Sequence, residues 1–204
     1  MIAEPMTLLT DYSLAGVTGW LALLLYRARE GRRARSLWTV AFAALALGAL
    51  LGGTWHGFAP VLSETALTLL WKATVLSIGV ASFGMLAGSA AATTMPSAAK
   101  PLLWIAAGKL AVYSGWMLFH SEYVYVIVDT GIALAAVAAL HVWSAIRERD
   151  AGSTWILTGV AVSLVAAAVQ ASGVSPHRHF NHNDLYHAIQ IAAMLVFYSG
   201  ARRL

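Results

Sequence analysis

Six of the seven histidines in this 204-residue chain fall at the same predicted end of its apolar segments. They are His56, His120, His177, His179, His182 and His187. Histidine is a common metal ligand, and its imidazole titrates near neutral pH. Because ionisable groups at membrane depth are energetically expensive, they mark candidate functional sites. The sequence therefore points to one histidine-rich end of the molecule as the place of its chemistry.

The composition predicts the class of protein that must position these histidines. The chain is 59% hydrophobic and 11% charged, whereas soluble domains carry about 25% charged residues. We expect an integral membrane protein with a single domain over residues 1–204. The absence of cysteine excludes disulfides, iron–sulfur clusters and thiolate zinc sites. Since the basic residues gather in short loops, they indicate topology rather than a nucleic-acid partner.

Seven apolar segments are long enough to be spanning helices, which need roughly 20 mostly apolar residues. The fold class is therefore all-α, a polytopic bundle of seven transmembrane helices. The predicted helices cover residues 8–26, 36–58, 63–87, 101–119, 122–146, 153–172 and 184–200. Proline falls in the intervening loops or at helix starts, as expected from its missing N–H. Asn183 and Asp184 are N-cap candidates for the last helix.

Arginine and lysine predict the orientation. The loops after the first, third and fifth helices and the C-terminus hold most of them, while the opposite loops hold only Arg178. Because positive loops stay in the cytoplasm, we expect the N-terminus outside and the C-terminus inside. This topology suits a bacterial cytoplasmic membrane protein whose histidine-rich end faces outward.

The same topology brings distant residues together. His56 ends the second helix, Glu64 begins the third, and His182 and His187 begin the seventh. Further residues expected at the wall of this site are Asp11, Thr54, His120, Asn183, Asp184 and Gln190. His177 and His179 suit a solvated loop, and His141 lies at the other end as an interfacial or packed histidine.

A second polar layer is predicted deeper in the membrane. Lys72, Lys109 and Asp129 lie within helices, on the order of 10–12 Å below the outer boundary at 1.5 Å per residue. A lone charge at this depth is costly, so Asp129 is expected to pair with Lys72 or Lys109. The pair would tie helices together or form the floor of a polar cavity.

Zinc is the cofactor that the histidine pattern favours. A catalytic zinc site uses three protein ligands and an open position for water, and the metal lowers the pKa of that water to near 7. His56, His182 and His187 could supply three nitrogens, with Glu64 as general base. His182 and His187 are five residues apart, so they could share a metal only if His182 preceded the helix.

These residues resemble the pattern of the CREST superfamily, which includes alkaline ceramidases and adiponectin-type receptors. His56 matches the family's helix-two histidine and His187 its second helix-seven histidine, in a chain of seven helices. Glu64 stands near the family's helix-three aspartate, Gly52 replaces its helix-two serine, and Asn183 replaces its first helix-seven histidine. The resemblance implies zinc-dependent hydrolysis of a lipid amide or ester. The run from Phe180 to His187 also resembles a motif of small bacterial membrane proteins to which no activity is assigned.

Two other function classes stay open. Haem b could bind between His56 and His187 or His120, which would make the protein an electron carrier. The layer of Lys72, Lys109 and Asp129 could instead serve a transporter or sensor. A membrane lipid is the expected partner in the hydrolase reading, and the sequence makes no prediction of an oligomer.

Overall fold

The computed structural model describes residues 2–148 and 151–204. These residues form seven helices and no strand, as predicted. The helices are α1 (Pro5–Arg27), α2 (Arg33–Phe58), α3 (Glu64–Thr93), α4 (Pro96–Phe119), α5 (Tyr123–Glu148), α6 (Ala151–Ser172) and α7 (His182–Ala201). Six of them, α1 to α6, are long and apolar enough to cross a membrane. The chain is therefore an all-helical protein with the properties of an integral membrane protein.

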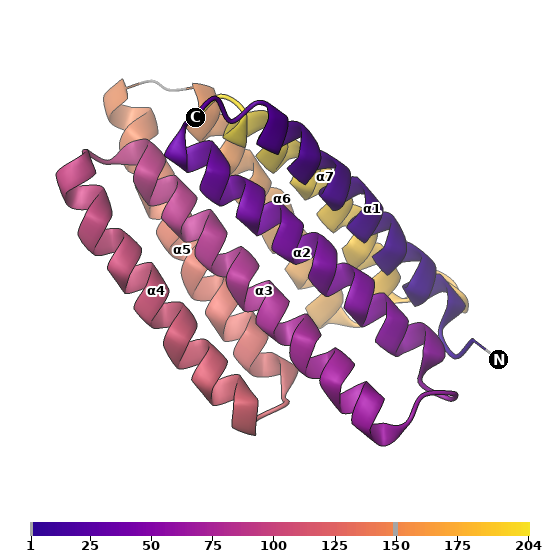
Figure 1. The fold of residues 1–204 in the computed structure, drawn as a ribbon. Helices are drawn as coiled ribbons and strands as arrows, with labels where there is room; N and C mark the ends of the chain where they lie inside the picture. The colour runs from indigo at the N-terminus through magenta and orange to yellow at the C-terminus, as the bar shows by residue number, and fades with distance from the viewer. Residues whose placement is uncertain (1, 149–150) are drawn as a thin grey trace.

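The helices lie side by side along one long axis, with the two chain ends at opposite ends of the bundle (Figure 1). α2 packs between α1 and α3, and α7 packs against α6 and α1. α4 lies at the edge of the bundle, where it packs on α3 and touches α5 only slightly (Figure 1). The histidine-rich end lies where α2 ends and α7 begins, and we call it the pocket end.

The two helix boundaries that differ most from the prediction are the end of α3 and the start of α4. α3 continues to Thr93 and α4 already begins at Pro96, with Pro101 inside the helix. Pro96 suits the first turn, where its missing N–H has no partner to lose. Pro101 removes one backbone hydrogen bond in the second turn, and the neighbouring bonds still keep that turn helical.

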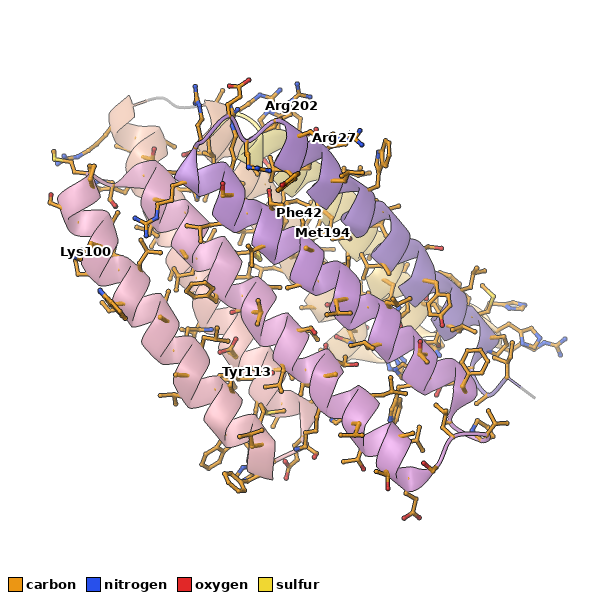
Figure 2. The ribbon with its side chains drawn as sticks, in the orientation of Figure 1. Arg27, Phe42, Lys100, Tyr113, Met194 and Arg202 are labelled. Atoms are coloured by element: carbon orange, nitrogen blue, oxygen red, sulfur yellow. The ribbon has the colours of Figure 1, made fainter. Side chains whose placement is uncertain are left out.

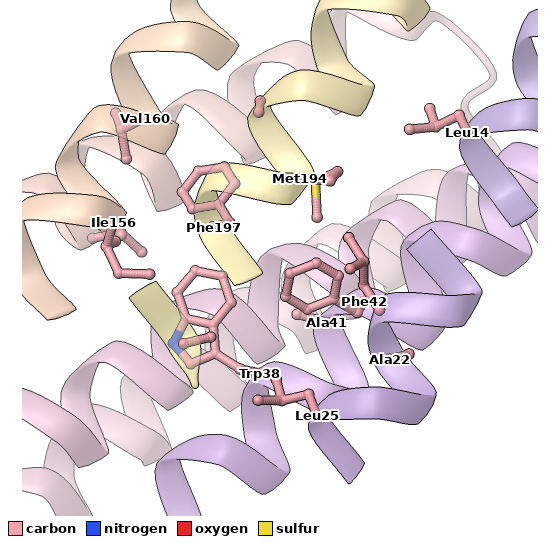
Figure 3. Close-up of a cluster of buried hydrophobic side chains, with 14 of the residues drawn as sticks. Leu14, Ala22, Leu25, Trp38, Ala41, Phe42, Ile156, Val160, Met194 and Phe197 are labelled. Atoms are coloured by element: carbon pink, nitrogen blue, oxygen red, sulfur yellow. The ribbon is translucent and has the colours of Figure 1, made fainter. Parts of the chain in front are cut away.

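The apolar core fills the half of the bundle opposite the pocket end. The indole of Trp38 lies 6.2 Å from the Phe42 ring and 5.6 Å from the Phe197 ring, centroid to centroid. Ile156 of α6 and Leu25 of α1 complete this cluster, and both are fully buried (Figure 3). Arg27, Lys100 and Arg202 lie at the same end of the molecule (Figure 2). One half is thus filled by large apolar side chains.

Glycines set how closely α1 approaches α2 at the pocket end. A Cβ at Gly53 would lie 2.8 Å from the Cβ of Asp11, and one at Gly57 would lie 2.8 Å from Leu8 Cδ2. The Leu8 side chain could shift, but the Cβ of Asp11 is fixed to its backbone, so a larger residue at position 53 would push α1 and α2 apart. Gly53 therefore allows Asp11 to approach α2 closely.

The predicted mid-membrane pairing is confirmed for one of its two alternatives. Lys109 Nζ lies 2.6 Å from Asp129 Oδ1 and 2.9 Å from Ser82 Oγ. Lys72 instead donates to the carbonyl oxygens of Met117 and His120, at 2.7 and 2.5 Å. Because the last carbonyls of a helix have no partner within it, Lys72 caps the end of α4. The three residues therefore do not form one continuous polar layer.

Candidate functional site

A pocket of about 220 Å³ lies at the pocket end, between α1, α2, α3, α5, α6 and α7. Its polar lining residues come from all six of these helices and include two of the three predicted metal ligands, His56 and His187. The full lining is Asp11, Leu14, Leu45, Gly48, Ala49, Gly52, His56, Trp71, Thr74, Ile78, Tyr123, Gln170, Asn183, Tyr186 and His187. Known pockets for drug-sized ligands measure about 300–1,000 Å³. This one therefore suits a small molecule or the head of an amphipathic one.

Small residues of α2 create the space. Gly48, Gly52 and His56 are spaced by four residues, so they lie on one face of the helix. A Cβ at Gly52 would lie 3.5 Å from Thr74 Cγ2, which is an ordinary contact. The space beside Gly52 is therefore open toward the pocket, unlike the tightly packed space at Gly53.

His187 is anchored at both ring nitrogens. Its Nε2 lies 3.3 Å from Asp11 Oδ1, and its Nδ1 lies 3.1 Å from Thr10 Oγ1. The Thr10 hydroxyl is also within 3.1 Å of the Thr7 carbonyl and 3.5 Å of Asp184 Oδ1. Asp11 and His187 are both buried. These contacts fix the imidazole against α1 and occupy the nitrogens that a ligand would use.

His56 has a different arrangement. Its Nδ1 lies 3.3 Å from Glu4 Oε2, but this ion-pair contact lacks the alignment of a hydrogen bond. The side chain lines the pocket, and its Nε2 makes no hydrogen bond among the described residues. A carboxylate beside one nitrogen of an imidazole orients the ring. Of the two pocket histidines, His56 is therefore the one whose second nitrogen no side chain holds.

The start of α7 differs from the prediction and moves His182 out of the site. The N-cap is Asn181, not Asn183 or Asp184, and its side chain accepts from the N–H groups of Asn183 and Asp184. Asp184 Oδ2 in turn accepts from the Asn181 N–H at 2.7 Å, which completes a capping box. His182 is thus the first residue of a regular helix, about 140° around it from His187. It is absent from the pocket lining.

Several other predicted site residues also lie elsewhere. Glu64 is exposed at the start of α3, and Thr54 donates to the Leu50 carbonyl. Gln190 reaches Ser163 Oγ at 3.4 Å, one turn below the pocket. His177 and His179 are exposed in the α6–α7 loop, as predicted. None of these five lines the pocket.

The turn between α4 and α5 is also separate from the pocket. The His120 ring stacks on Trp116 at 3.9 Å, and its Nδ1 lies 3.0 Å from the Trp116 carbonyl. Backbone N–H groups of Glu122 and Ser121 hold the pKa of the exposed Glu122 carboxyl below its ordinary value. The prediction that His120 belongs to the site wall is not matched by this geometry.

His141 was predicted to be either an interfacial or a packed histidine, and the structure shows it packed. It is fully buried, with Nδ1 at 2.9 Å from Ser153 Oγ and Nε2 at 3.1 Å from Ser89 Oγ. It links α3, α5 and α6 at the end of the bundle opposite the pocket.

The residues present do not fit the predicted three-histidine zinc site. Within residues 2–148 and 151–204, no three or more His, Asp or Glu side chains come together closely enough to hold a metal. His182 and Glu64 do not reach the pocket. The alternative of a haem between His56 and His187 or His120 stays a prediction.

The aromatic wall was not predicted from the sequence. Trp71, Tyr123 and Tyr186 line the pocket, and the Trp71 ring lies 6.0 Å from the Tyr123 ring. Trp71 Nε1 donates to the Ser121 carbonyl at 2.8 Å, which fixes the indole plane. Trp71 also lines a second, outer groove with Trp55, so its indole separates the groove from the pocket. In an apolar chain with eight tryptophans, spacing alone does not separate pocket aromatics from lipid anchors.

The fold and pocket define a helical-bundle membrane protein with paired carboxylates and histidines at one end. The chain belongs to a family of unknown function, DUF6962, whose profile matches residues 6–204. No curated protein and no solved structure matches the chain significantly. The resemblance to the CREST superfamily stays a prediction.

Proposed function

We propose that this protein is a membrane hydrolase that cleaves an amide or ester bond of an amphipathic molecule. The observation that carries the proposal is the convergence of two carboxylate–histidine pairs on one pocket. Glu4 contacts His56, Asp11 contacts His187, and both histidines line the same space. A concave, mostly apolar pocket with a few convergent polar groups is the usual place of a functional site.

In the proposed reaction His56 is the general base. Its Nε2 accepts a proton from a water molecule, whose oxygen attacks the carbonyl carbon of the substrate. Glu4 stabilises the imidazolium that forms. The C–N or C–O bond then breaks, and the proton on His56 passes to the leaving nitrogen or oxygen. The products are a carboxylic acid and an amine or alcohol.

Polar groups on the opposite wall would receive the developing negative charge. The side chains of Asn183 and Gln170 are joined by a hydrogen bond of 3.2 Å and both line the pocket. Hydrogen-bond donors fixed in an apolar site stabilise an oxyanion more strongly than water does. The Asn183 amide and the hydroxyls of Tyr123 and Tyr186 are candidates for this role. Since the donor set does not fit zinc, no step is assigned to a metal.

The substrate is expected to reach the pocket from the membrane. If the N-terminus lies outside, the pocket is in the outer half of a bacterial cytoplasmic membrane. The apolar lining, with Leu14, Leu45 and Ile78, suits the first carbons of a lipid chain. The pocket volume of about 220 Å³ holds only part of a lipid, so the rest of its tail would remain in the bilayer.

The test is turnover of fluorogenic amides and esters, with acyl chains of two to twelve carbons, by the full chain in nanodiscs. We expect cleavage by the unmodified protein and a loss of at least about 100-fold in His56→Ala, the scale of general base catalysis. His179→Ala, in the exposed loop, is the matched control and should keep its activity. Equal rates in His56→Ala and the unmodified protein would remove the proposed mechanism, and no turnover by folded protein would remove the function.

A further inference from the structure

The fixed charge around the pocket has one sign. Asp11 lines the pocket, and Glu4 contacts the lining residue His56. Asp184 is linked to the lining residue His187 through the Thr10 hydroxyl. No lysine or arginine is among the described residues that line it. Apart from the histidines, the ionisable side chains in and next to the pocket are thus acidic among the described residues.

The lysines of the bundle do not offset this charge. Lys72 is committed to the carbonyls that end α4, and Lys109 is committed to Asp129 and Ser82. Asp184 is partly compensated, because it lies in the first turn of α7 and accepts the Asn181 N–H. Asp11 has no such support, because it lies in the second turn of α1.

Asp11 is also the carboxyl group that a ligand can reach. It is 5% exposed, and its Oδ1 contacts His187 Nε2 at 3.3 Å. A buried carboxylate is costly unless a positive group pairs with it, especially within a membrane. Because the side chain lines the pocket, an occupant with a positively charged donor would satisfy it.

The aromatic wall has the same preference. Trp71, Tyr123 and Tyr186 present rings to the pocket. The face of an aromatic ring is negative, and it attracts ammonium groups within about 6 Å of its centre. Both the carboxyl groups and the rings therefore favour a cation and disfavour a carboxylate, phosphate or sulfate.

From this geometry we infer that the pocket binds the positively charged nitrogen of an ammonium head group. The inference rests on the proposed function and specifies its substrate class, an amide or ester whose head carries an ammonium. The ammonium group of the substrate would lie between Asp11 and the Trp71 ring. The carbonyl would then lie toward His56, which lines the same pocket.

The experiment is calorimetric titration of the full chain in nanodiscs with three probes of equal chain length, hexylammonium, hexyltrimethylammonium and hexyl sulfate. Empty nanodiscs correct for partition into lipid. We expect saturable binding of at least one ammonium probe, at least ten-fold tighter than that of the sulfate. The inference would be overturned if hexyl sulfate bound as tightly as the better of the two ammonium probes. It would also be overturned if neither ammonium probe showed saturable binding.

Variants locate the binding. Asp11→Asn should weaken ammonium binding at least ten-fold, whereas Glu122→Gln, which removes an exposed carboxyl group outside the pocket, should not. If Asp11→Asn does not fold, Trp71→Leu against Trp71→Phe tests the ring, and only the leucine variant should lose several-fold in affinity. Equal binding by the variant and its control would count against the site.

The outcomes separate this inference from the proposed function. Ammonium binding without cleavage of any amide or ester keeps the head-group assignment and removes the hydrolase. Cleavage without preference for an ammonium head keeps the hydrolase and removes the assignment.

Discussion

At the scale of single residues, the two pocket histidines differ in which ring nitrogen meets a carboxylate. His56 contacts Glu4 through Nδ1, and His187 contacts Asp11 through Nε2. The remaining nitrogen of His187 is held by Thr10, whereas the structure gives the Nε2 of His56 no hydrogen bond among the described residues. This difference is why the proposed reaction uses His56 as the base and His187 as a positioning residue for Asp11.

Glu4→Gln tests the orienting carboxylate. The variant keeps the side-chain shape and removes the charge that stabilises protonated His56. Because Glu4 is 45% exposed and partly screened, we expect a loss in kcat on the order of 10-fold, smaller than that of His56→Ala. KM should change little. Steady-state kinetics on the best substrate measure this, with Glu64→Gln as the exposed control at the same end. A glutamine variant as active as the unmodified protein would contradict the role of Glu4.

Gly52→Leu tests the pocket itself. A Cβ at Gly52 meets only Thr74 Cγ2 at 3.5 Å, so the larger side chain would extend into the pocket without displacing a helix. We expect turnover and ligand binding to fall at least about ten-fold, while the thermal midpoint changes by only a few degrees. Gly16→Leu is the matched control, because no atom lies within 4 Å of its Cβ position. Full activity in Gly52→Leu would show that the substrate binds elsewhere.

Chelation tests the metal-free mechanism. Since the described residues do not bring three His, Asp or Glu side chains together at a metal, treatment with EDTA and 1,10-phenanthroline should leave the rate unchanged. Elemental analysis of the same sample gives the zinc content per chain. A rate that is lost on chelation and restored by zinc would favour the three-ligand site of the sequence analysis.

At the scale of elements, two lysine contacts join the edge helix α4 to its neighbours. Lys109 binds Asp129 of α5 and Ser82 of α3, and Lys72 of α3 caps the last turn of α4. α4 touches α5 only slightly otherwise. In a bilayer there is no hydrophobic force between helices, so such polar contacts carry much of the association.

A double-mutant cycle measures the buried ion pair. Lys109→Met or Asp129→Leu alone leaves one charge unpaired in the membrane, which costs about 3–5 kcal/mol. The double variant removes both charges and should be more stable than either single variant. Thermal unfolding in a mild detergent gives the order. Additive losses in the double variant would show that the pair contributes no coupling energy.

At the scale of the whole molecule, the bundle is divided into an apolar half and a polar half. Trp38, Phe42 and Phe197 close one half, and the glycines of α2 leave space in the other. The chain begins and ends at opposite ends of the bundle (Figure 1). Seven crossings would therefore place the termini on opposite sides of a membrane.

The absence of cysteine makes this topology directly testable. His179→Cys lies in the exposed α6–α7 loop and Ser97→Cys at the exposed start of α4. We expect an impermeant maleimide to label the first in intact cells and the second only after permeabilisation. Reversed labelling would place the pocket on the cytoplasmic side, and labelling of both from one side would exclude seven crossings.

The sequence by itself determined the elements. Apolar runs of about 20 residues predict spanning helices, because backbone N–H and C=O groups in a bilayer must form their hydrogen bonds with each other. All seven helices were predicted, and the errors lie at their ends. Asn181 rather than Asn183 caps α7 because a capping box needs an acidic residue three positions later, and Asp184 provides it. The pairing of Asp129 with a lysine also followed from the cost of a lone charge in the membrane.

Only the tertiary structure decided the composition of the site. Helix rotation determines which residues share a pocket, and the weak periodicity of apolar helices does not reveal rotation. His182 and Glu64 therefore looked suitable from sequence but point elsewhere, whereas Glu4, Trp71 and Tyr186 gave no signal. The position of Asp11 depends on Gly53, which allows α1 and α2 to approach. Contacts between helices distant in sequence made the site, and spacing along one chain cannot specify them.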